Sequence, residues 1–184
     1  MLKDILLAVW FFLPAAVGNA TPIIAAKLPY LENWTFPLDG YAMFHGKRLL
    51  GDHKTVRGLF TGILAGSATA FLQVELYSNV AWVREIVALD YSRINPLLFG
   101  TLAALGALSG DALKSFFKRQ SNIAPGRSWF PFDQIDYVLG GIVFTACYVP
   151  LSLTQYLYVI GIWTLIHPIA TFIGYTLNLK SSPI

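Results

Sequence analysis

The most restrictive feature of the sequence is a long block near its C-terminal end that contains no charged side chain. Residues 137–179 include no Asp, Glu, Lys or Arg. A helix that crosses the ~30 Å apolar core of a bilayer needs about 20 predominantly apolar residues, so this block is too long for one helix. Pro150 and Ser152 offer a turn within it. We therefore expect two membrane-spanning helices here.

The composition of the whole chain supports a membrane protein. The 184 residues are 55% hydrophobic and only 12% charged, whereas soluble domains average roughly 25% charged residues. The mean hydropathy is +0.57. The single cysteine, Cys147, excludes an internal disulfide. The net charge of +3 suits a membrane surface or an anionic ligand, but it is not clustered enough to indicate a nucleic-acid partner.

Three further apolar segments precede this block, so we predict an all-α integral membrane protein of one domain with about five transmembrane helices. The first segment contains Pro14 and Pro22, which membrane helices tolerate because neighbouring helices satisfy the freed carbonyl groups. Its start resembles a signal peptide, but apolar residues continue past Ala20 for long enough to span. The expected spans are residues 4–28, 58–77, 94–112, 135–151 and 155–178.

The distribution of Lys and Arg predicts the orientation of these helices. The loops expected at 29–57 and 113–134 each carry a cluster of four basic residues, whereas the loop between them has two arginines in balance with two acids. Cytoplasmic loops of membrane proteins carry an excess of Lys and Arg. We therefore expect both basic loops in the cytoplasm, the N-terminus outside and the C-terminus inside, in a multi-pass protein of the cell membrane.

The second basic loop opens with a polar pattern of helical spacing. Asp111, Lys114, Ser115 and Lys118 lie at positions i, i+3, i+4 and i+7. If the preceding helix continues into the cytoplasm, these side chains share one face, and Arg119 extends it. A carboxylate, a hydroxyl and ammonium groups on one face suit a metal-bound phosphate.

Two more carboxylates, Asp133 and Asp136, follow at i and i+3 where the next helix is expected to begin. Each carboxylate alone could be an interfacial group or a residue that favours the helix dipole. Three carboxylates among four cations favour a site, because Mg²⁺ prefers hard oxygen ligands and is usually shared with substrate phosphates. We expect Asp111, Asp133 and Asp136 to hold one or two Mg²⁺ ions.

The first basic loop ends in a Gly-rich, basic stretch, residues 51–58, at the expected start of a helix. Backbone N–H groups at a helix start, with Lys54, Thr55 and Arg57, would form a phosphate cradle. The stretch is not a Walker A motif, and a loop that is basic only for topology is the alternative. Asp52 and Asp39 are possible further site residues, although Asp39 could equally be a turn residue.

Two sequence blocks together resemble a known family. The blocks are GDALKSFFKR at 110–119, followed by PG at 125–126 and DQID at 133–136, and KTVRG at 54–58. They are similar to the GD…S..KR…PGHGG..DR.D and KT.EG segments of the CDP-diacylglycerol synthase superfamily, although this sequence has no PGHGG. The short chain, PLDG at 37–40 and GDHKTVRG at 51–58 resemble its archaeal branch, the CDP-archaeol synthases. The sequence departs from the superfamily pattern at residues 122–132 and at Gln134, where the superfamily has Arg.

The resemblance implies a cytidylyltransferase. CTP and 2,3-di-O-geranylgeranylglyceryl 1-phosphate would give a CDP-activated ether lipid and pyrophosphate, with Mg²⁺. Asp111, Asp133 and Asp136 would hold the metal, and the triphosphate would be held by Lys54, Thr55, Arg57, Lys118 and Arg119. For the lipid chains we expect a groove along small residues, Gly62, Gly66 and Ala107. The alternatives are a synthase acting on ester lipids, a small transporter or channel, and a structural subunit; the oligomeric state stays open.

Overall fold

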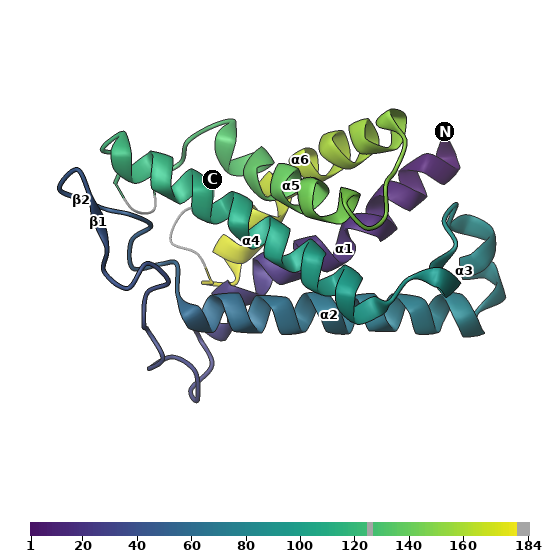
Figure 1. Ribbon diagram of the computed structural model, residues 1–184, viewed down its shortest axis with the longest axis horizontal. Helices are drawn as coiled ribbons and strands as arrows, with labels where there is room; N and C mark the ends of the chain where they lie inside the picture. The colour runs from purple at the N-terminus through teal and green to yellow at the C-terminus, as the bar shows by residue number, and fades with distance from the viewer. Residues whose placement is uncertain (125–126, 180–184) are drawn as a thin grey trace.

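The protein folds as a bundle of long helices, and the two loops expected to be basic lie at the same end of it (Figure 1). The computed structural model describes residues 1–124 and 127–179. Four of the described helices are long and apolar enough to cross a membrane, which makes the chain a multi-pass membrane protein. They are α1 (Leu2–Ala25), α2 (Val56–Asn79), α4 (Pro96–Gln120) and α6 (Leu153–Thr176).

A fifth helix, α5 (Phe132–Ala146), is shorter than the span expected at 135–151. It has 15 residues, fewer than the roughly 20 that a spanning helix needs. Its last turn closes with N–H groups of Tyr148 and Val149 bonded to Thr145 O, and Pro150 follows. Ser152 then begins α6 with a capping box to Gln155, which matches the turn expected there.

The connection between α4 and α5 is also shorter than the loop expected at 113–134. Helix α4 continues to Gln120, so residues 113–120 are helical and belong to the same rod as the apolar segment. Because α5 begins at Phe132, the connection between the two helices runs only from 121 to 131. The PG pair that contributes to the family resemblance, 125–126, lies outside the described residues.

Helices α1, α2 and α4 approach one another through small residues. A Cβ atom at Gly62 would lie 2.6 Å from Gly18 O, and one at Gly66 would lie 2.7 Å from Ala104 Cβ. Ala107 has no exposed surface. The lipid groove expected along Gly62, Gly66 and Ala107 is therefore wrong: these residues join helices, because close backbone approach leaves no space beside them.

The expected loop at 29–57 has a compact fold of its own at this end of the bundle. It contains a short hairpin, β1 (Met43–Phe44) with β2 (Lys47–Arg48), and an isolated bridge between Pro37 and Thr55. Lys47 Nζ donates to Gln120 O at 2.6 Å, which fixes the hairpin to the end of α4. At the other end of the bundle lie α3 (Ala81–Ile86) and the 3-10 turn η1 (Tyr91–Arg93).

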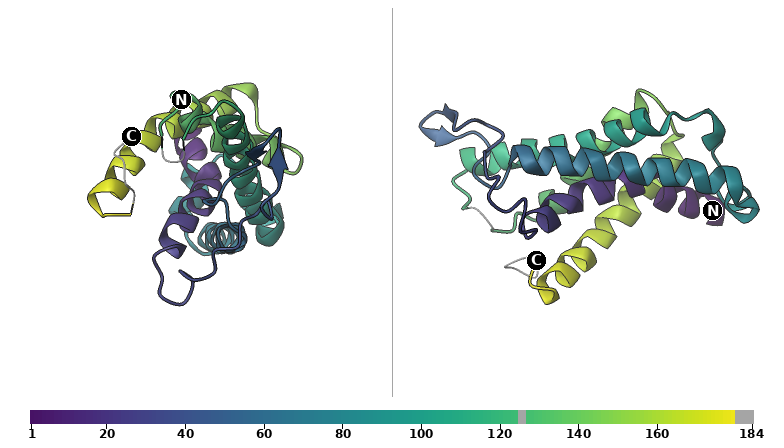
Figure 2. Two further views of the ribbon diagram at one scale, coloured as in Figure 1. Left: turned by 90° about the vertical axis from the view of Figure 1, so that its left-hand side faces the viewer. Right: turned by 90° about the horizontal axis from the view of Figure 1, so that it is seen from below.

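Helix α6 diverges from the rest of the bundle toward its C-terminal end (Figure 2). Among the described residues it packs against α1 and α5, and not against α2 or α4. Trp163 joins α6 to both of these helices. Its Nε1 donates to Ala8 O of α1 at 3.0 Å, and Tyr137 of α5 donates to Trp163 O at 2.9 Å. The C-terminal half of α6 therefore stands apart from α2 and α4 on the side of the polar loops.

Candidate active site

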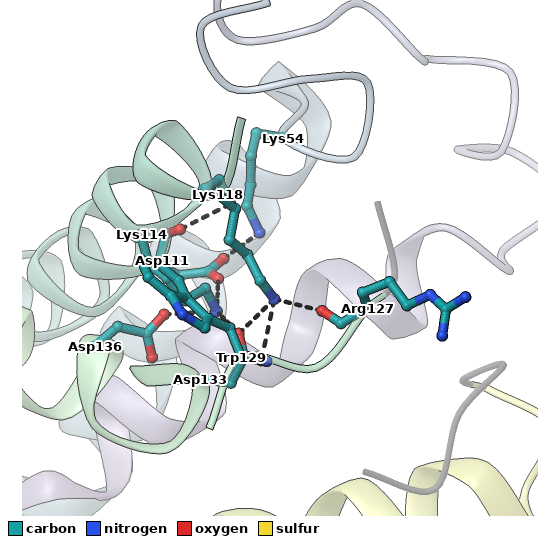
Figure 3. A network of polar contacts seen from close by, with 9 residues as sticks. Lys54, Asp111, Lys114, Lys118, Arg127, Trp129, Asp133 and Asp136 are labelled. Atoms are coloured by element: carbon teal, nitrogen blue, oxygen red, sulfur yellow. Dashed lines mark hydrogen bonds and ion pairs between the residues drawn. The ribbon is translucent and has the colours of Figure 1, made fainter. Parts of the chain in front are cut away.

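Six charged side chains meet where α4, α5 and the first loop come together (Figure 3). Lys114 of α4 stands at the centre: its Nζ lies 3.1 Å from Asp111 Oδ1, 2.9 Å from Asp133 Oδ1 and 2.7 Å from Asp136 Oδ2. Asp111 lies one turn away on α4, and the other two carboxylates lie on the first turns of α5. The helical spacing of both segments thus aims three carboxylates at one point, which we call the carboxylate cluster.

Two further lysines pair with carboxylates of the cluster. Lys54 reaches in from the first loop and pairs with Asp111 Oδ2. Lys118, one turn beyond Lys114, donates to both carboxylate oxygens of Asp133 at 2.8 and 3.0 Å and to Arg127 O at 2.6 Å. Three ammonium groups therefore balance three carboxylates, and the pairs join segments far apart in the sequence.

Asp133 organises the start of α5. Burial works against its ionised form, but hydrogen bonds from Lys118 and from the Trp129 backbone N–H, with the charge of Lys114, lower the pKa of its carboxyl below the usual range. The side chain therefore stays ionised and holds the residues before α5 against α4.

A cavity of about 750 Å³ opens beside the cluster. Its polar wall includes Lys54, Lys114 and Asp133, together with Asp111 and Lys118. Its apolar wall comes from the end of α1 and from the diverging half of α6, and includes Pro22, Ile23, Ala26, Pro168 and Leu179. One space therefore joins a charged end to an apolar side between two membrane helices.

A smaller cavity of about 180 Å³ lies on the hairpin side of the same lysines. It is lined by Gly51 and His53 of the first loop and by Ser115 and Arg119 of α4. Lys54, Asp111, Lys114 and Lys118 line both cavities. The charged groups can thus be reached from two sides.

Comparison with known proteins connects this arrangement to a family. The family model for "CarS-like: CDP-archaeol synthase" matches residues 1–184. This chain belongs to the CDP-archaeol synthase family.

Individual relatives agree over nearly the full length. The CDP-archaeol synthase of Methanospirillum hungatei is 32% identical over 92% of this chain and 93% of its own, and that of Thermococcus onnurineus is 29% identical over 99% and 98%. A solved structure, described as "Structural insight into an intramembrane enzyme for archaeal membrane lipids biosynthesis", has a TM-score of 0.70 at 31% identity and covers 89% of this chain and 91% of that one. Membership of the family sets aside the transporter and structural-subunit alternatives.

The carboxylate cluster suits the metal expected for a CDP-archaeol synthase. Oxygens of three carboxylates already share one cation, the Lys114 ammonium, within 3.1 Å. Gln134 lines the cavity and is 5% exposed, and its Oε1 is buried without a hydrogen-bond partner in the described part of the chain. Hard oxygens of this kind are what Mg²⁺ prefers. Among the described residues, no group of three or more His, Cys, Asp or Glu side chains is arranged to hold a metal ion, and within the carboxylate cluster the Lys114 ammonium contacts all three carboxylates.

The residues expected to bind phosphate differ in how free they are to do so. Thr55 is the N-cap of α2, where its Oγ1 accepts from Gly58 N at 3.1 Å, and it lines the larger cavity. Arg57 is 7% exposed, and its Nη1 donates to Leu31 O at 2.8 Å and Glu32 O at 3.1 Å. Because these bonds hold the first loop to α2, we assign Arg57 a structural role there as well as a place on the cavity wall.

The three remaining expected site residues act mainly within their own segments. Asp39 has a side chain 1% exposed and accepts from Leu50 N at 2.9 Å, Gly51 N at 3.2 Å and Arg48 Nη2 at 2.7 Å. Asp52 is largely exposed and pairs with Arg48 Nη1 at 2.6 Å. Ser115 is buried and donates to Asp111 O at 2.9 Å. Of the two roles considered for Asp39, a site residue or a turn residue, the structure therefore shows the turn residue.

Several residues of this site carry no signal in the sequence. His167 and Thr171 of α6 line the larger cavity, although they lie in an apolar helix with no recognisable motif. In the sequence, Gln134 differs from the Arg of the superfamily pattern, and nothing else distinguishes it. The placement of α6 beside α1 depends on tertiary packing, so local spacing could not have identified these residues.

Proposed function

We propose that the carboxylate cluster and the cavity beside it form the active site at which this CTP-dependent cytidylyltransferase makes CDP-archaeol. The activity follows from the family. The observation that supports its placement is the convergence of Lys54, Lys114 and Lys118 with three carboxylates at a cavity that continues between α1 and α6. Such a space can receive both a triphosphate and the headgroup of a lipid.

The reaction needs positioning and charge neutralisation more than acid–base chemistry. An oxygen of the lipid phosphate attacks the α-phosphorus of CTP; a phosphorus–oxygen bond forms there, and the bond to the β-phosphate oxygen breaks to release pyrophosphate. The attacking monoester is already ionised near neutral pH, since its second pKa is about 6, so no side chain has to remove a proton. Lys54 and Lys118 stand where they can neutralise charge on the departing pyrophosphate.

Asp111, Asp133 and Asp136 are the residues that would hold Mg²⁺. A bound divalent ion supplies charge neutralisation and a template for phosphate oxygens. Arg119 and Thr55 extend the polar walls on either side. The site thus accounts for most of the residues that the family resemblance assigns to metal and triphosphate.

The lipid acceptor enters, in this proposal, between α1 and α6. The apolar wall formed by Pro22, Ile23 and Pro168 lies at the level of membrane helices, so isoprenoid chains can remain in the bilayer while the phosphate reaches the lysines. The acceptor is an isoprenoid glycerol ether phosphate, in keeping with the relatives' activity. The polar end faces the cytoplasm, where CTP is present and where basic loops belong.

The test is transfer of labelled cytidylate from CTP to lipid by the purified protein, with Mg²⁺ and with ether-linked or ester-linked lipid phosphate as acceptor. We expect CDP-lipid from the ether acceptor, and a loss of about 100-fold or more in Asp111→Asn, as is typical when an electrostatic group of an active site is removed. Asp90→Asn is the matched control, because Asp90 is exposed at the other end of the bundle and pairs with Arg93 at 3.3 Å. Equal activity of Asp111→Asn and Asp90→Asn would overturn the placement of the site.

A further inference from the structure

Lys114 holds the place of a cation within the carboxylate cluster. Its Nζ contacts one oxygen of each of Asp111, Asp133 and Asp136 within 3.1 Å, and its side chain is 14% exposed. In contrast, Lys54 pairs only with Asp111, and Lys118 among these carboxylates only with Asp133. Lys114 is therefore the one lysine of the described site that joins all three carboxylates.

The cluster without a divalent ion is electrically balanced. Three carboxylates face three ammonium groups in a partly buried setting, where unpaired charges are costly. A divalent ion that entered beside Lys114 would lie close to a like charge in a medium that screens poorly. The carboxylates can therefore bind a divalent ion well only when the Lys114 ammonium withdraws.

The structure provides space for that withdrawal. Lys114 lines both the larger and the smaller cavity, and a lysine carries its charge on a flexible four-carbon stem. Both cavities are also lined by Lys54 and Lys118, where the phosphates of CTP are proposed to bind. An ammonium that leaves the carboxylates can be received by those phosphates.

We propose that Lys114 is an exchangeable counter-ion: it keeps the three carboxylates together in the free enzyme and yields its place to a divalent ion. The inference deepens the proposed function, because it rests on these carboxylates as the metal ligands. It adds that the free enzyme binds the metal weakly and that Lys114 causes this weakness. It assigns Lys114 a positioning role between metal and nucleotide.

The test measures Mn²⁺ affinity of the purified protein, without nucleotide, from the electron paramagnetic resonance signal of free Mn²⁺. Lys114→Met is expected to bind Mn²⁺ at least about tenfold more tightly than the wild type, since a like charge has been removed from the site. Lys47→Met is the matched control, because Lys47 donates to Gln120 O at 2.6 Å outside the cluster. The Mn²⁺ affinity of this variant should equal that of the wild type.

The double variant Lys114→Met with Asp133→Asn separates the two proposals. If Lys114→Met binds no more tightly than wild type while the double variant loses Mn²⁺ binding, the exchange is overturned and the metal ligands stand. If the double variant binds Mn²⁺ as tightly as Lys114→Met does, both the ligand assignment and the exchange are overturned.

A measurement on the wild type covers the case in which Lys114→Met does not fold. Acylation of lysines by a small reagent, read by mass spectrometry, should increase at Lys114 relative to Lys47 when Mn²⁺ is added, because the ammonium leaves its carboxylates. No change in the Lys114 to Lys47 ratio at saturating Mn²⁺ would overturn the proposal.

Discussion

At the scale of single residues, Asp39 shows how one buried carboxylate can organise a loop. It accepts hydrogen bonds from the backbone of Leu50 and Gly51 and from Arg48. Burial opposes its ionisation, but these bonds hold the pKa of Asp39 at about 2, against about 3.9 for a free aspartate. A lowered folded pKa means that the ionised side chain stabilises the loop above about pH 4 and that this contribution is lost as the pH falls toward 2.

We therefore predict that Asp39→Asn loosens the loop at neutral pH. A hydrogen bond to a charged acceptor contributes about 1.5 kcal/mol or more, so amide protection at Leu50 and Gly51 should fall about tenfold in hydrogen exchange. The wild type should lose the same protection between pH 4 and pH 2. Asp52→Asn, which removes an exposed carboxylate paired with the same arginine, should leave both amides protected. Unchanged protection in Asp39→Asn would show that its turn is maintained by other contacts.

The sequence predicts part of this residue-level arrangement and not the rest. The spacing of Asp111, Lys114 and Lys118 places them on one helix face, and the structure has them there because α4 continues past the apolar segment. The pairing of Lys54 with Asp111 crosses from one loop to another, so no local pattern could reveal it. That Lys114 fills the space between the carboxylates likewise depends on the approach of α5.

At the scale of elements, the site depends on how closely α4 and α5 approach. A Cβ atom at Gly110 would collide with the backbone carbonyl of Asp136, and one at Gly140 with that of Gly106. Gly106, Gly110 and Gly140 therefore form the contact that brings the carboxylates of α5 to Asp111 on α4. Small residues recur along this part of the sequence, at Gly106, Ala107 and Gly110, but no local pattern identifies α5 as the helix that they contact.

We predict that Gly110→Ala lowers both stability and activity. Overpacking of this kind typically costs about 1–3 kcal/mol, and a displacement of about 1 Å at the carboxylates can reduce turnover by up to about 100-fold. Thermal unfolding in detergent and the cytidylyl transfer assay would measure the two effects. Gly161→Ala is the matched control, because a Cβ atom there meets nothing within 4 Å. If Gly110→Ala and Gly161→Ala have the same stability and the same activity, the close contact between α4 and α5 does not position the site.

The differences between expected and observed elements have a common cause. The hydropathy of residues 135–151 suggests a full span, yet α5 ends at Ala146, because a helix end depends on which backbone groups find partners. Hydropathy places residues 113–120 in a loop, yet they are helical, as the helical spacing of Asp111, Lys114 and Lys118 allowed. Lys114 and Lys118 pair there with carboxylates of α5. Hydropathy identifies apolar segments and cannot specify where each helix stops.

At the scale of the whole molecule, the charged groups are divided unequally between the two ends of the bundle. The carboxylate cluster, the hairpin and the basic residues of the first loop lie at one end, and the N-terminus, α3 and η1 lie at the other (Figure 1). The excess of Lys and Arg predicts that the first of these ends is cytoplasmic.

Single-cysteine labelling tests this orientation. In a Cys147→Ala background, which removes the native and exposed thiol, a membrane-impermeant thiol reagent added from outside should label Asn79→Cys and not Ser121→Cys. Both positions are exposed and lie at opposite ends of the bundle. Permeabilised cells, in which both variants should react, are the control. If the reagent added from outside labels Ser121→Cys and not Asn79→Cys, the orientation is the opposite of the predicted one.

The divergence of α6 has a consequence for how the enzyme meets its acceptor. If the lipid reaches the lysines through the apolar wall between α1 and α6, it travels in two dimensions and never leaves the bilayer. The quantity that controls its encounter rate is then its mole fraction in the membrane rather than its bulk concentration. Adding inert lipid at a constant total amount of acceptor lipid should therefore slow the reaction, because it lowers the mole fraction of the acceptor. CTP arrives from the aqueous side, so the rate should saturate with its concentration in solution.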